Sequence, residues 1–254
     1  MKALKSLAKK MLGERRARAL HQIACRIAYR GTARYCPCCD SQCRKFLSFG
    51  IETRHDVRCP FCGSLERHRL ISLYLEQRTD LFDGRRKKLL HVAPEAPLSS
   101  AIERADYIDY LSADLDRPDV MARMDITDID YPADTFDVIL CSHVLEHVPE
   151  DRKAMAEFFR VPKPGGWAIL QVPILAETTF EDFSVTDPAE RERLFGQHDH
   201  VRSYGPDYAD RLAEAGFSGT VDAFVRDLGE AEIRRQGLTR HENVYFCVKD
   251  AASA

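Results

Sequence analysis

The sequence of 254 residues lacks long hydrophobic runs. No apolar stretch approaches the roughly 18 residues that a membrane-spanning helix needs. The first residues, MKALKSLAKKML, also lack the continuous apolar core of a secretory signal peptide. We therefore expect a protein of the reducing cytoplasm, in which the nine cysteines do not form disulfides.

Glycine is missing from the centre of the chain, since none occurs between Gly84 and Gly165. A turn that passes close under a bound ligand normally uses glycine, because glycine has no side chain. Any ligand-binding turn in this stretch therefore needs a different backbone path from that of a glycine-rich loop.

Charge is unevenly distributed, although the formal net charge is only −3. Residues 1–88 contain 21 Lys and Arg against 8 Asp and Glu, whereas the remainder contains 16 against 32. A basic front end favours an anionic partner.

Residues 1–30 carry nine basic side chains and one acid, Glu14, with apolar residues at helical spacing between them. The pattern predicts a basic amphipathic helix. Two interpretations stay open. The helix contacts an anionic membrane peripherally or binds nucleic acid, or it packs on the protein with its basic face in solvent.

Four cysteines have the spacing of a zinc ribbon, in two C-P-x-C turns separated by nineteen residues. Each turn delivers two thiolates, and structural zinc binds four of them tetrahedrally. Such a closed site leaves no position for catalysis, so we assign the metal to folding or docking. The predicted ligands are Cys36, Cys39, Cys59 and Cys62.

Neighbouring side chains leave this ligand set open. Cys38 or Cys43 is an alternative to Cys39, and His68 in CGSLERHR is close enough in sequence to be considered. Spacing alone does not choose among them.

The most informative stretch, residues 136–174, reads as strand, turn, helix, tight turn and strand. The apolar run 138–141 suits a buried parallel strand, and apolar residues then recur at helical spacing up to Val161. Pro-Gly-Gly at 164–166 ends the helix, and a second apolar run, 167–172, follows at once. This order predicts a βαβ unit.

The phrases FDVI, VLEHV and PKPGG in this unit resemble the fourth and fifth strands of class I S-adenosylmethionine-dependent methyltransferases, of the type 11-like kind. The resemblance implies an α/β fold: a doubly wound, seven-stranded, mostly parallel, Rossmann-like sheet whose last strand is antiparallel. It also implies S-adenosylmethionine as cofactor. With CGSLERHR, HVAPE and FGQHDHVR, the chain resembles a bacterial family of zinc-ribbon methyltransferases.

We accordingly predict four parts. These are a basic helix at residues 1–30, a zinc ribbon at 31–64, a connecting helix at 65–86 and the methyltransferase domain at 87–250. A charged insertion, 227–242, is expected between the last two strands of that domain.

The turn after the first strand departs from the family pattern. Methyltransferases usually place a Gly-x-Gly-x-Gly turn there, whereas this chain has HVAPEAP, with Ala93, Glu95 and Pro97 at the glycine positions. Glu95 is a candidate to bind the ammonium group of the cofactor. In the alternative interpretation, the domain keeps the fold and has lost the cofactor.

Later residues match the cofactor contacts of the family. Asp114 ends the second strand, nineteen residues after Glu95, near the spacing at which a carboxylate accepts hydrogen bonds from ribose hydroxyls. In MDITD, the resemblance assigns Asp125 to the adenine amino group and Ile126 to the ring face. Ala93 and Ser142 complete the predicted cofactor-binding set.

The loop after the fourth strand, residues 142–147, is expected near the transferred methyl group, because ligands bind at the carboxyl ends of parallel strands. His143 is the first candidate for a general base that deprotonates an attacking hydroxyl or amine. His200, in a later segment expected to close over the site, is the second catalytic candidate.

Ubiquinone-biosynthesis O-methyltransferases and small-RNA 3′-end methyltransferases carry a metal-binding Glu-x-x-Glu-His cluster with a later His, and this chain has His-x-x-Glu-His. The resemblance implies a second divalent metal at Glu146, His147 and His198, where it would hold and acidify a substrate oxygen. His143 replaces the first Glu of the cluster. In the other interpretation, Glu146 and His147 only tie strand to helix.

The sequence predicts an enzyme that methylates a small-molecule or glycan-like acceptor, on oxygen. Arg202 and Tyr204 suit an anionic or sugar-like acceptor. One alternative is an RNA or DNA methyltransferase that docks nucleic acid through the ribbon and the basic front end, although few aromatics accompany those basic residues. Another is a non-catalytic binding module.

Overall fold

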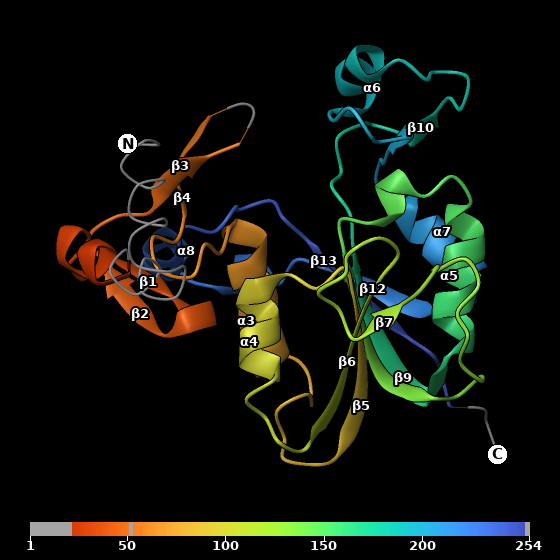
Figure 1. Cartoon of the computed structure of the whole chain (residues 1–254), viewed down its shortest axis with the longest axis horizontal. Helices are drawn as coiled ribbons and strands as arrows, with labels where there is room; N and C mark the ends of the chain where they lie inside the picture. The colour runs from red at the N-terminus through yellow and green to blue at the C-terminus, as the bar shows by residue number, and fades with distance from the viewer. Residues whose placement is uncertain (1–21, 51–52, 252–254) are drawn as a thin grey trace. The chain divides into compact units, whose positions relative to one another are not determined.

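The computed structural model describes residues 22–50 and 53–251, which divide into two units (Figure 1). The first unit takes the residues up to Arg78 together with Val225–Glu242, and the second takes Thr79–Phe224 and the residues from Asn243. The helix predicted at residues 1–30 lies mostly outside the described residues, of which 22–28 are helical. None of the helices among the described residues is long and apolar enough to cross a membrane.

The second unit is built on a seven-stranded sheet of order β12-β13-β9-β8-β5-β6-β7. Neighbouring strands from β9 to β7 pair in parallel, whereas β13 runs antiparallel to both β9 and β12. The predicted doubly wound, mostly parallel sheet with a reversed last strand is thereby confirmed. The strands are β5 (Lys87–Val92), β6 (Ile108–Asp114), β7 (Ala122–Arg123), β8 (Phe136–Ser142), β9 (Pro162–Gln171), β12 (Ser218–Asp222) and β13 (Val244–Val248).

Helices cover both faces of this sheet. Helix α4 (Ala96–Ile102) lies on one face, and α5 (Asp151–Arg160) and α7 (Tyr208–Glu214) lie on the other (Figure 1). Met155 and Phe158 of α5 are fully buried in the core. Because the inner strands are covered on both sides, they read as apolar runs instead of alternating patterns, which is why β8 could be recognised from the sequence.

Residues 173–204 form an insertion that leaves β9 at the carboxyl edge of the sheet and projects at the top of Figure 1. It contains the antiparallel pair β10 (Phe180–Glu181) and β11 (Arg202–Ser203), with α6 (Pro188–Phe195) between them. The register pairs Ser142 with Gln171, so the insertion begins beside the loop that follows β8. Its strands and helix were not predicted from the sequence.

Among the described residues, the first unit contains two short antiparallel pairs of strands and three α-helical segments, the first of them at residues 22–28. Strand β1 (Arg34–Cys36) pairs with β2 (Ser41–Cys43), and β3 (Leu47–Phe49) pairs with β4 (Arg54–Arg58). A 3-10 turn, η1 (Pro37–Cys39), follows β1, and helix α3 (Glu66–Gln77) follows the second C-P-x-C turn. The imidazole Nδ1 of His68 accepts a hydrogen bond from the amide of Leu65, so this histidine caps α3.

The segment 225–242 differs from the predicted domain boundaries, because it packs with the first unit and not with the sheet. It contains most of the 3-10 turn η3 (Phe224–Asp227) and helix α8 (Glu230–Gln236). The buried guanidinium of Arg69 donates to the carbonyls of Gln236 (2.5 Å) and Gly237 (2.8 Å), and the Arg235 guanidinium lies 5.0 Å from the ring centre of Tyr35. These contacts join residues more than 160 positions apart, which no local pattern encodes.

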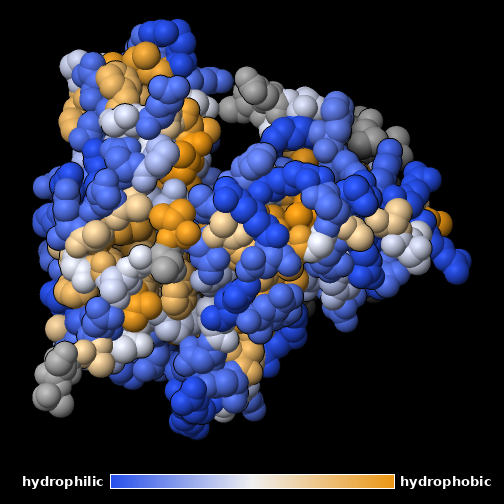
Figure 2. Space-filling model, turned by 180° about the vertical axis from the view of Figure 1, so that it is seen from behind, coloured by the Kyte–Doolittle hydropathy of each residue, from blue (hydrophilic) through white to orange (hydrophobic). Residues whose placement is uncertain are grey.

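Large apolar side chains are exposed mainly on the second unit. On the face drawn in Figure 2, hydrophobic residues (orange) lie among hydrophilic ones (blue) on that part of the molecule. Four of the exposed large apolar residues of this unit belong to the insertion at residues 173–204, which therefore offers apolar surface beside the carboxyl edge of the sheet. The exposed large apolar residues described in this unit are Leu115, Met121, Ile174, Leu175, Phe180, Phe183 and Val221.

Candidate functional site

A cavity of about 640 Å³ opens at the carboxyl edge of the sheet in the second unit. Its wall comes from the ends of β5, β6 and β8, from the loop before β8 and from Asp199 of the insertion. Ligands of doubly wound sheets bind at this edge. The predicted site residues that line the cavity are Ala93, Asp114, Asp125, Ile126, His143 and His147.

The turn after β5 has alanine at the position where a glycine-rich loop would have glycine. Ala93 has φ of +46°, the left-handed conformation that glycine adopts most easily. A non-glycine residue there costs about 1–2 kcal/mol. Two hydrogen bonds hold the turn: the Ala93 amide donates to Ala113 (2.8 Å), and the Arg117 guanidinium donates to the Pro94 carbonyl (2.7 Å). The backbone thus takes a glycine-like path with the smallest side chain.

Asp114 lies at the carboxyl end of β6 and is fixed by its own loop. Its Oδ1 accepts hydrogen bonds from the amides of Asp116 (2.9 Å) and Arg117 (3.1 Å). The second carboxylate oxygen is left to accept hydrogen bonds from a ligand in the cavity.

Asp125 and Ile126 form another part of the wall. The amide and hydroxyl of Thr127 donate to Asp125 Oδ1, both at 2.8 Å, and these hydrogen bonds lower the pKa of the carboxyl group. Ile126 is buried and presents an apolar surface. A carboxylate beside an apolar wall suits the amino group and the ring face of an adenine.

Glu95 and Ser142 do not line the cavity. Glu95 is the N-cap residue of α4, where its carbonyl accepts from the amides of Leu98 and Ser99. Ser142 is the buried last residue of β8. Their assignment to the cofactor stays a prediction.

His143 follows β8 in a strained turn. Its φ is +56°, and its amide donates to the Gln171 carbonyl at 2.8 Å. Left-handed backbone at a non-glycine residue is concentrated at functional sites. The turn places the partly exposed imidazole in the cavity wall, with Nδ1 3.3 Å from Oε1 of Glu146.

Glu146, His147 and His200 come together with their ligand atoms all within 4.8 Å of one another. His198, the predicted third metal ligand, is exposed and lies outside this group, so His200 takes that place. The reason is local: His200 is turned inward, and its Nδ1 lies 2.9 Å from the Phe195 carbonyl oxygen.

The donor set of this cluster fits a divalent cation. The carboxylate of Glu146 is 1% exposed, and neither of its oxygens has a hydrogen-bond partner among the described residues. A carbonyl only accepts, so His200 Nδ1 carries the proton and Nε2 keeps a free lone pair. Burial lowers the pKa of His200, which keeps its imidazole neutral. A carboxylate with two imidazoles is a common transition-metal donor set.

Asp199 was not singled out from the sequence. It lines the cavity, and its Oδ2 lies 3.4 Å from Nδ1 of His147. The motif His198-Asp-His200 was the available signal, since carboxylates often orient the imidazoles of a metal site.

Arg202 and Tyr204 do not contact the cavity, which corrects their predicted role as acceptor-binding residues. Both are fully buried. The Tyr204 hydroxyl donates to Asp151 Oδ2 at 2.7 Å, and the Arg202 guanidinium donates to backbone carbonyls of the turn at 145–149. Their polar groups are used inside the protein.

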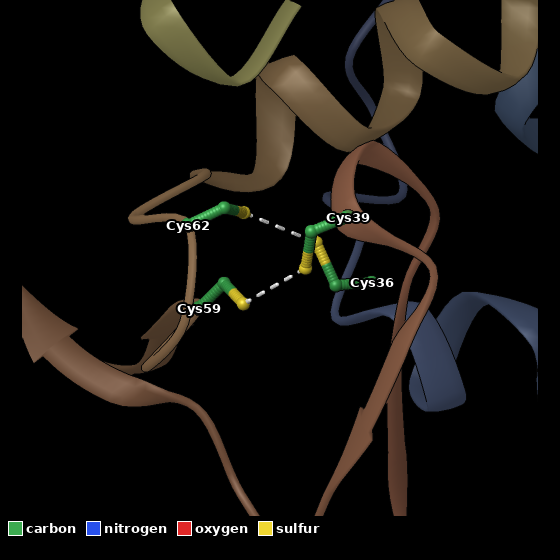
Figure 3. Close-up of side chains that lie close together, drawn as sticks. All are labelled: Cys36, Cys39, Cys59 and Cys62. Carbon is green, nitrogen blue, oxygen red and sulfur yellow. Dashed lines mark hydrogen bonds between the residues drawn. The ribbon is translucent and has the colours of Figure 1, made fainter. Parts of the chain in front are cut away.

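In the first unit, the four predicted cysteines converge (Figure 3). The Sγ atoms of Cys36 and Cys62 are 3.6 Å apart, and those of Cys39 and Cys59 are 3.8 Å apart. A tetrahedron with zinc–sulfur bonds of about 2.3 Å has edges of about 3.8 Å, whereas a disulfide bond is about 2.05 Å long. The geometry therefore fits zinc.

Cys38, Cys43 and His68 lie outside this group. Both cysteines are buried, and burial raises the pKa of the Cys43 thiol to about 11. The Ser64 hydroxyl lies 3.0 Å from the Cys36 sulfur, a contact to a ligand that spacing arguments did not anticipate.

Comparison with known protein families gives a match to the methyltransferase domain model over residues 101–170. No curated protein matches the chain. The matched residues run from α4 to the end of β9 and include Asp114, Asp125, His143, Glu146 and His147.

Solved structures resemble this chain in fold. The [4+2]-cyclase SpnF is 18% identical, with 73% of this chain and 82% of that chain covered and a TM-score of 0.51. A SAM-dependent methyltransferase from Archaeoglobus fulgidus is 12% identical. The match covers 71% of this chain and 93% of that chain, with a TM-score of 0.46. The carbon methyltransferase CurJ is 15% identical. The match covers 73% of this chain and 53% of that chain, with a TM-score of 0.45. The chain thus carries a class I, Rossmann-like methyltransferase domain, accompanied by a small N-terminal unit with a ribbon-type cluster of four cysteines.

Proposed function

We propose that the protein transfers a methyl group from S-adenosylmethionine to a hydroxyl oxygen of a small-molecule or glycan-like acceptor. The supporting observation is the cavity, whose wall combines Asp114, Asp125 and Ile126 with the imidazole of His143. When bound, the cofactor supplies a methyl group on a sulfonium centre, already activated for in-line displacement. The chain then has to align the acceptor and remove a proton.

The residues divide this work. Oδ2 of Asp114 accepts hydrogen bonds from the ribose hydroxyls, Asp125 accepts from the adenine amino group, and Ile126 packs on the ring. His143 Nδ1 faces Glu146, so Nε2 is the atom that takes the acceptor proton. The nearby Glu146 carboxylate stabilises the resulting imidazolium, as an acid does beside a catalytic histidine.

The proposal includes a divalent metal held by Glu146, His147 and His200. When bound, such an ion would hold and acidify a substrate oxygen. The buried carboxylate of Glu146 supports this, because its oxygens have no hydrogen-bond partner among the described residues and an uncompensated buried charge is costly. The free lone pair on His200 Nε2 points to the same role.

The wall of the cavity favours a neutral acceptor over nucleic acid. Five carboxylates line it, and no Lys or Arg does so among the described residues, so a phosphodiester would be repelled. The exposed apolar residues of the insertion suit an acceptor with an apolar part. The lining acids are Asp114, Asp116, Asp125, Glu150 and Asp199.

For the first unit we propose a structural zinc at Cys36, Cys39, Cys59 and Cys62. We also propose a peripheral contact of residues 1–30 with an anionic membrane in the cytoplasm. The exposed Ile23 and Ile27, on the described part of that helix, support this contact.

Asp114→Ala tests the cofactor site. We expect S-adenosylmethionine and S-adenosylhomocysteine to bind at least about tenfold more weakly, because a hydrogen bond to a charged group contributes about 1.5–3 kcal/mol. Calorimetric titration of the purified protein measures both affinities.

Two further variants separate charge from loop structure. Asp114→Asn keeps the Oδ1 acceptor for the amides of Asp116 and Arg117, so equal losses in the Asn and Ala variants point to the carboxylate charge. Asp116→Ala, at an exposed neighbour in the same wall, should bind normally. Unchanged binding by Asp114→Ala would remove this residue from the site.

His143→Asn tests the general base. Asparagine tolerates left-handed backbone, so the turn at φ +56° is preserved. We expect methyl transfer to phenolic and glycosidic hydroxyl compounds, followed as S-adenosylhomocysteine formation, to slow about 100-fold or more. Cofactor affinity should stay within twofold. Equal turnover in the variant and the wild type would exclude His143 as the base.

A further inference from the structure

We infer that Arg202 is a positioning residue that shapes the turn at residues 145–149, which carries Glu146 and His147. The inference rests on the proposed function, because it assigns these two side chains to the reacting site. It starts from the burial of Arg202, whose guanidinium is 0% exposed although the residue belongs to the projecting insertion.

Four of the five N–H groups of this guanidinium donate hydrogen bonds. Nη1 donates to the carbonyls of Leu145 (2.8 Å) and Val148, and Nη2 donates to the carbonyl of Pro149 (2.8 Å) and lies 3.6 Å from Asp151 Oδ1. Nε donates to Oε2 of Glu181 at 2.9 Å. Four of the five donors of the planar fork are used in hydrogen bonds, and three of the acceptors are backbone carbonyls of one turn.

This turn is too short to satisfy itself. Only residues 145–147 form a single 3-10 turn, η2, in which the Val148 amide donates to the Leu145 carbonyl at 3.2 Å, so the carbonyls of Val148 and Pro149 need partners from elsewhere. Arg202 supplies these and a second donor to the Leu145 carbonyl, so it binds the turn on both sides of Glu146 and His147. The orientation of the two side chains therefore depends on a residue more than 50 positions away.

The neighbours of Arg202 act on the same turn. The amide of Val201 donates to the Glu146 carbonyl at 3.0 Å, and His200 brings its imidazole to the cluster. Three consecutive residues thus act together: His200 supplies a side chain to the cluster, and Val201 and Arg202 supply a backbone donor and a guanidinium to the turn that carries Glu146 and His147.

Charge balance holds this arrangement in place. Arg202 and Arg211 face the two carboxylates of Asp151 and Glu181, and Tyr204 donates to Asp151. A buried guanidinium is tolerated only when it is paired in this way. Glu181 belongs to β10, so the folding of the insertion and the shape of the turn are linked through Arg202.

Arg202→Lys compared with Arg211→Lys tests the inference. Both variants keep the charge, but Arg211 contacts only the carboxylates and none of the turn carbonyls among its described hydrogen bonds. For Arg202→Lys we expect Co²⁺ binding and methyl transfer each to fall about 10- to 100-fold, as when a residue that orients a ligand is lost. Cofactor affinity should stay within twofold, and Arg211→Lys should change every value less than threefold.

Amide hydrogen exchange at His147 and Val148 is the second readout, and it needs neither metal nor acceptor. We expect exchange at least tenfold faster in Arg202→Lys and unchanged in Arg211→Lys. Wild-type protein that fails to bind Co²⁺ would contradict the metal part of the proposed function and leave the positioning role to be decided by exchange. Amide exchange in Arg202→Lys at the wild-type rates would overturn the inference.

A second variant, Glu181→Gln, serves if Arg202→Lys does not fold. It weakens the hydrogen bond from Arg202 Nε, so we expect exchange at His147 and Val148 to become about threefold faster. Unchanged exchange rates in this variant would equally overturn the inference.

Discussion

Replacing Cys59 by serine is expected to release zinc and unfold the ribbon at residues 31–64, while the sheet of the second unit stays folded. The buried apolar cluster around the metal site consists of Cys36, Cys38, Cys43, Cys59 and Phe46, so little core remains in the ribbon once the metal is lost. Structural zinc contributes on the order of 10–16 kcal/mol to small domains, comparable to the whole stability of an ordinary one. Metal analysis and limited proteolysis between residues 31 and 64 measure the effect.

The same variant should loosen α8. Arg69 binds the carbonyls of Gln236 and Gly237 with one side of its guanidinium and those of Val57 and Ser64 with the other. Loss of the ribbon removes the second pair, so amide exchange in residues 230–236 should rise with the release of zinc.

Cys43→Ser is the matched control, since Cys43 is equally buried but lies outside the four-thiol group. It should keep one zinc per chain and lose at most modest stability. A full zinc complement in Cys59→Ser, or zinc loss in Cys43→Ser, would contradict the proposed ligand set.

The sheet could be predicted because its signal is local. Strand β8, helix α5 and strand β9 each carry an apolar pattern of the right period, and the phrases of the methyltransferase family fall on them. Asp114 could be placed by the same logic, since it ends an apolar strand and therefore lies at the carboxyl edge.

Contacts between distant segments could not be predicted. His198 and His200 are two residues apart, and only the bond from His200 to the Phe195 carbonyl turns the second one inward. The charged residues of 225–242 gave no sign that Arg69 would hold them in the first unit. Arg202 read as a substrate contact because its sequence context does not reveal burial.

The missing glycines led to a wrong expectation, because a backbone path different from that of a glycine-rich loop was predicted after β5. A glycine-like turn follows β5, but it is formed by Ala93 at φ +46° and tied down by Arg117. A search for Gly-x-Gly-x-Gly looks for the residue that relieves strain, whereas this turn keeps the strain and offsets it with hydrogen bonds.

Glu146→Gln should move stability and activity in opposite directions. The carboxylate is buried beside His143 without hydrogen-bond donors among the described residues, and a neutral isostere removes the charge that has to be desolvated. We expect the metal-free protein to gain about 1–2 kcal/mol in free energy of unfolding, measured by urea denaturation in EDTA. Methyl transfer should fall at least about 100-fold, because both the metal and the partner of His143 are lost.

His198→Gln is the control for this variant, because His198 is exposed, close in sequence to His200 and outside the cluster. It should change neither the unfolding free energy nor the turnover, and it should bind Co²⁺ like the wild type. A merely structural Glu146 predicts the reverse sign, since removing a charge that holds the turn together would destabilise the protein. A lower unfolding free energy in Glu146→Gln, together with unchanged Co²⁺ binding, would therefore contradict a metal site at this position and leave His143 to act with a structural acid beside it.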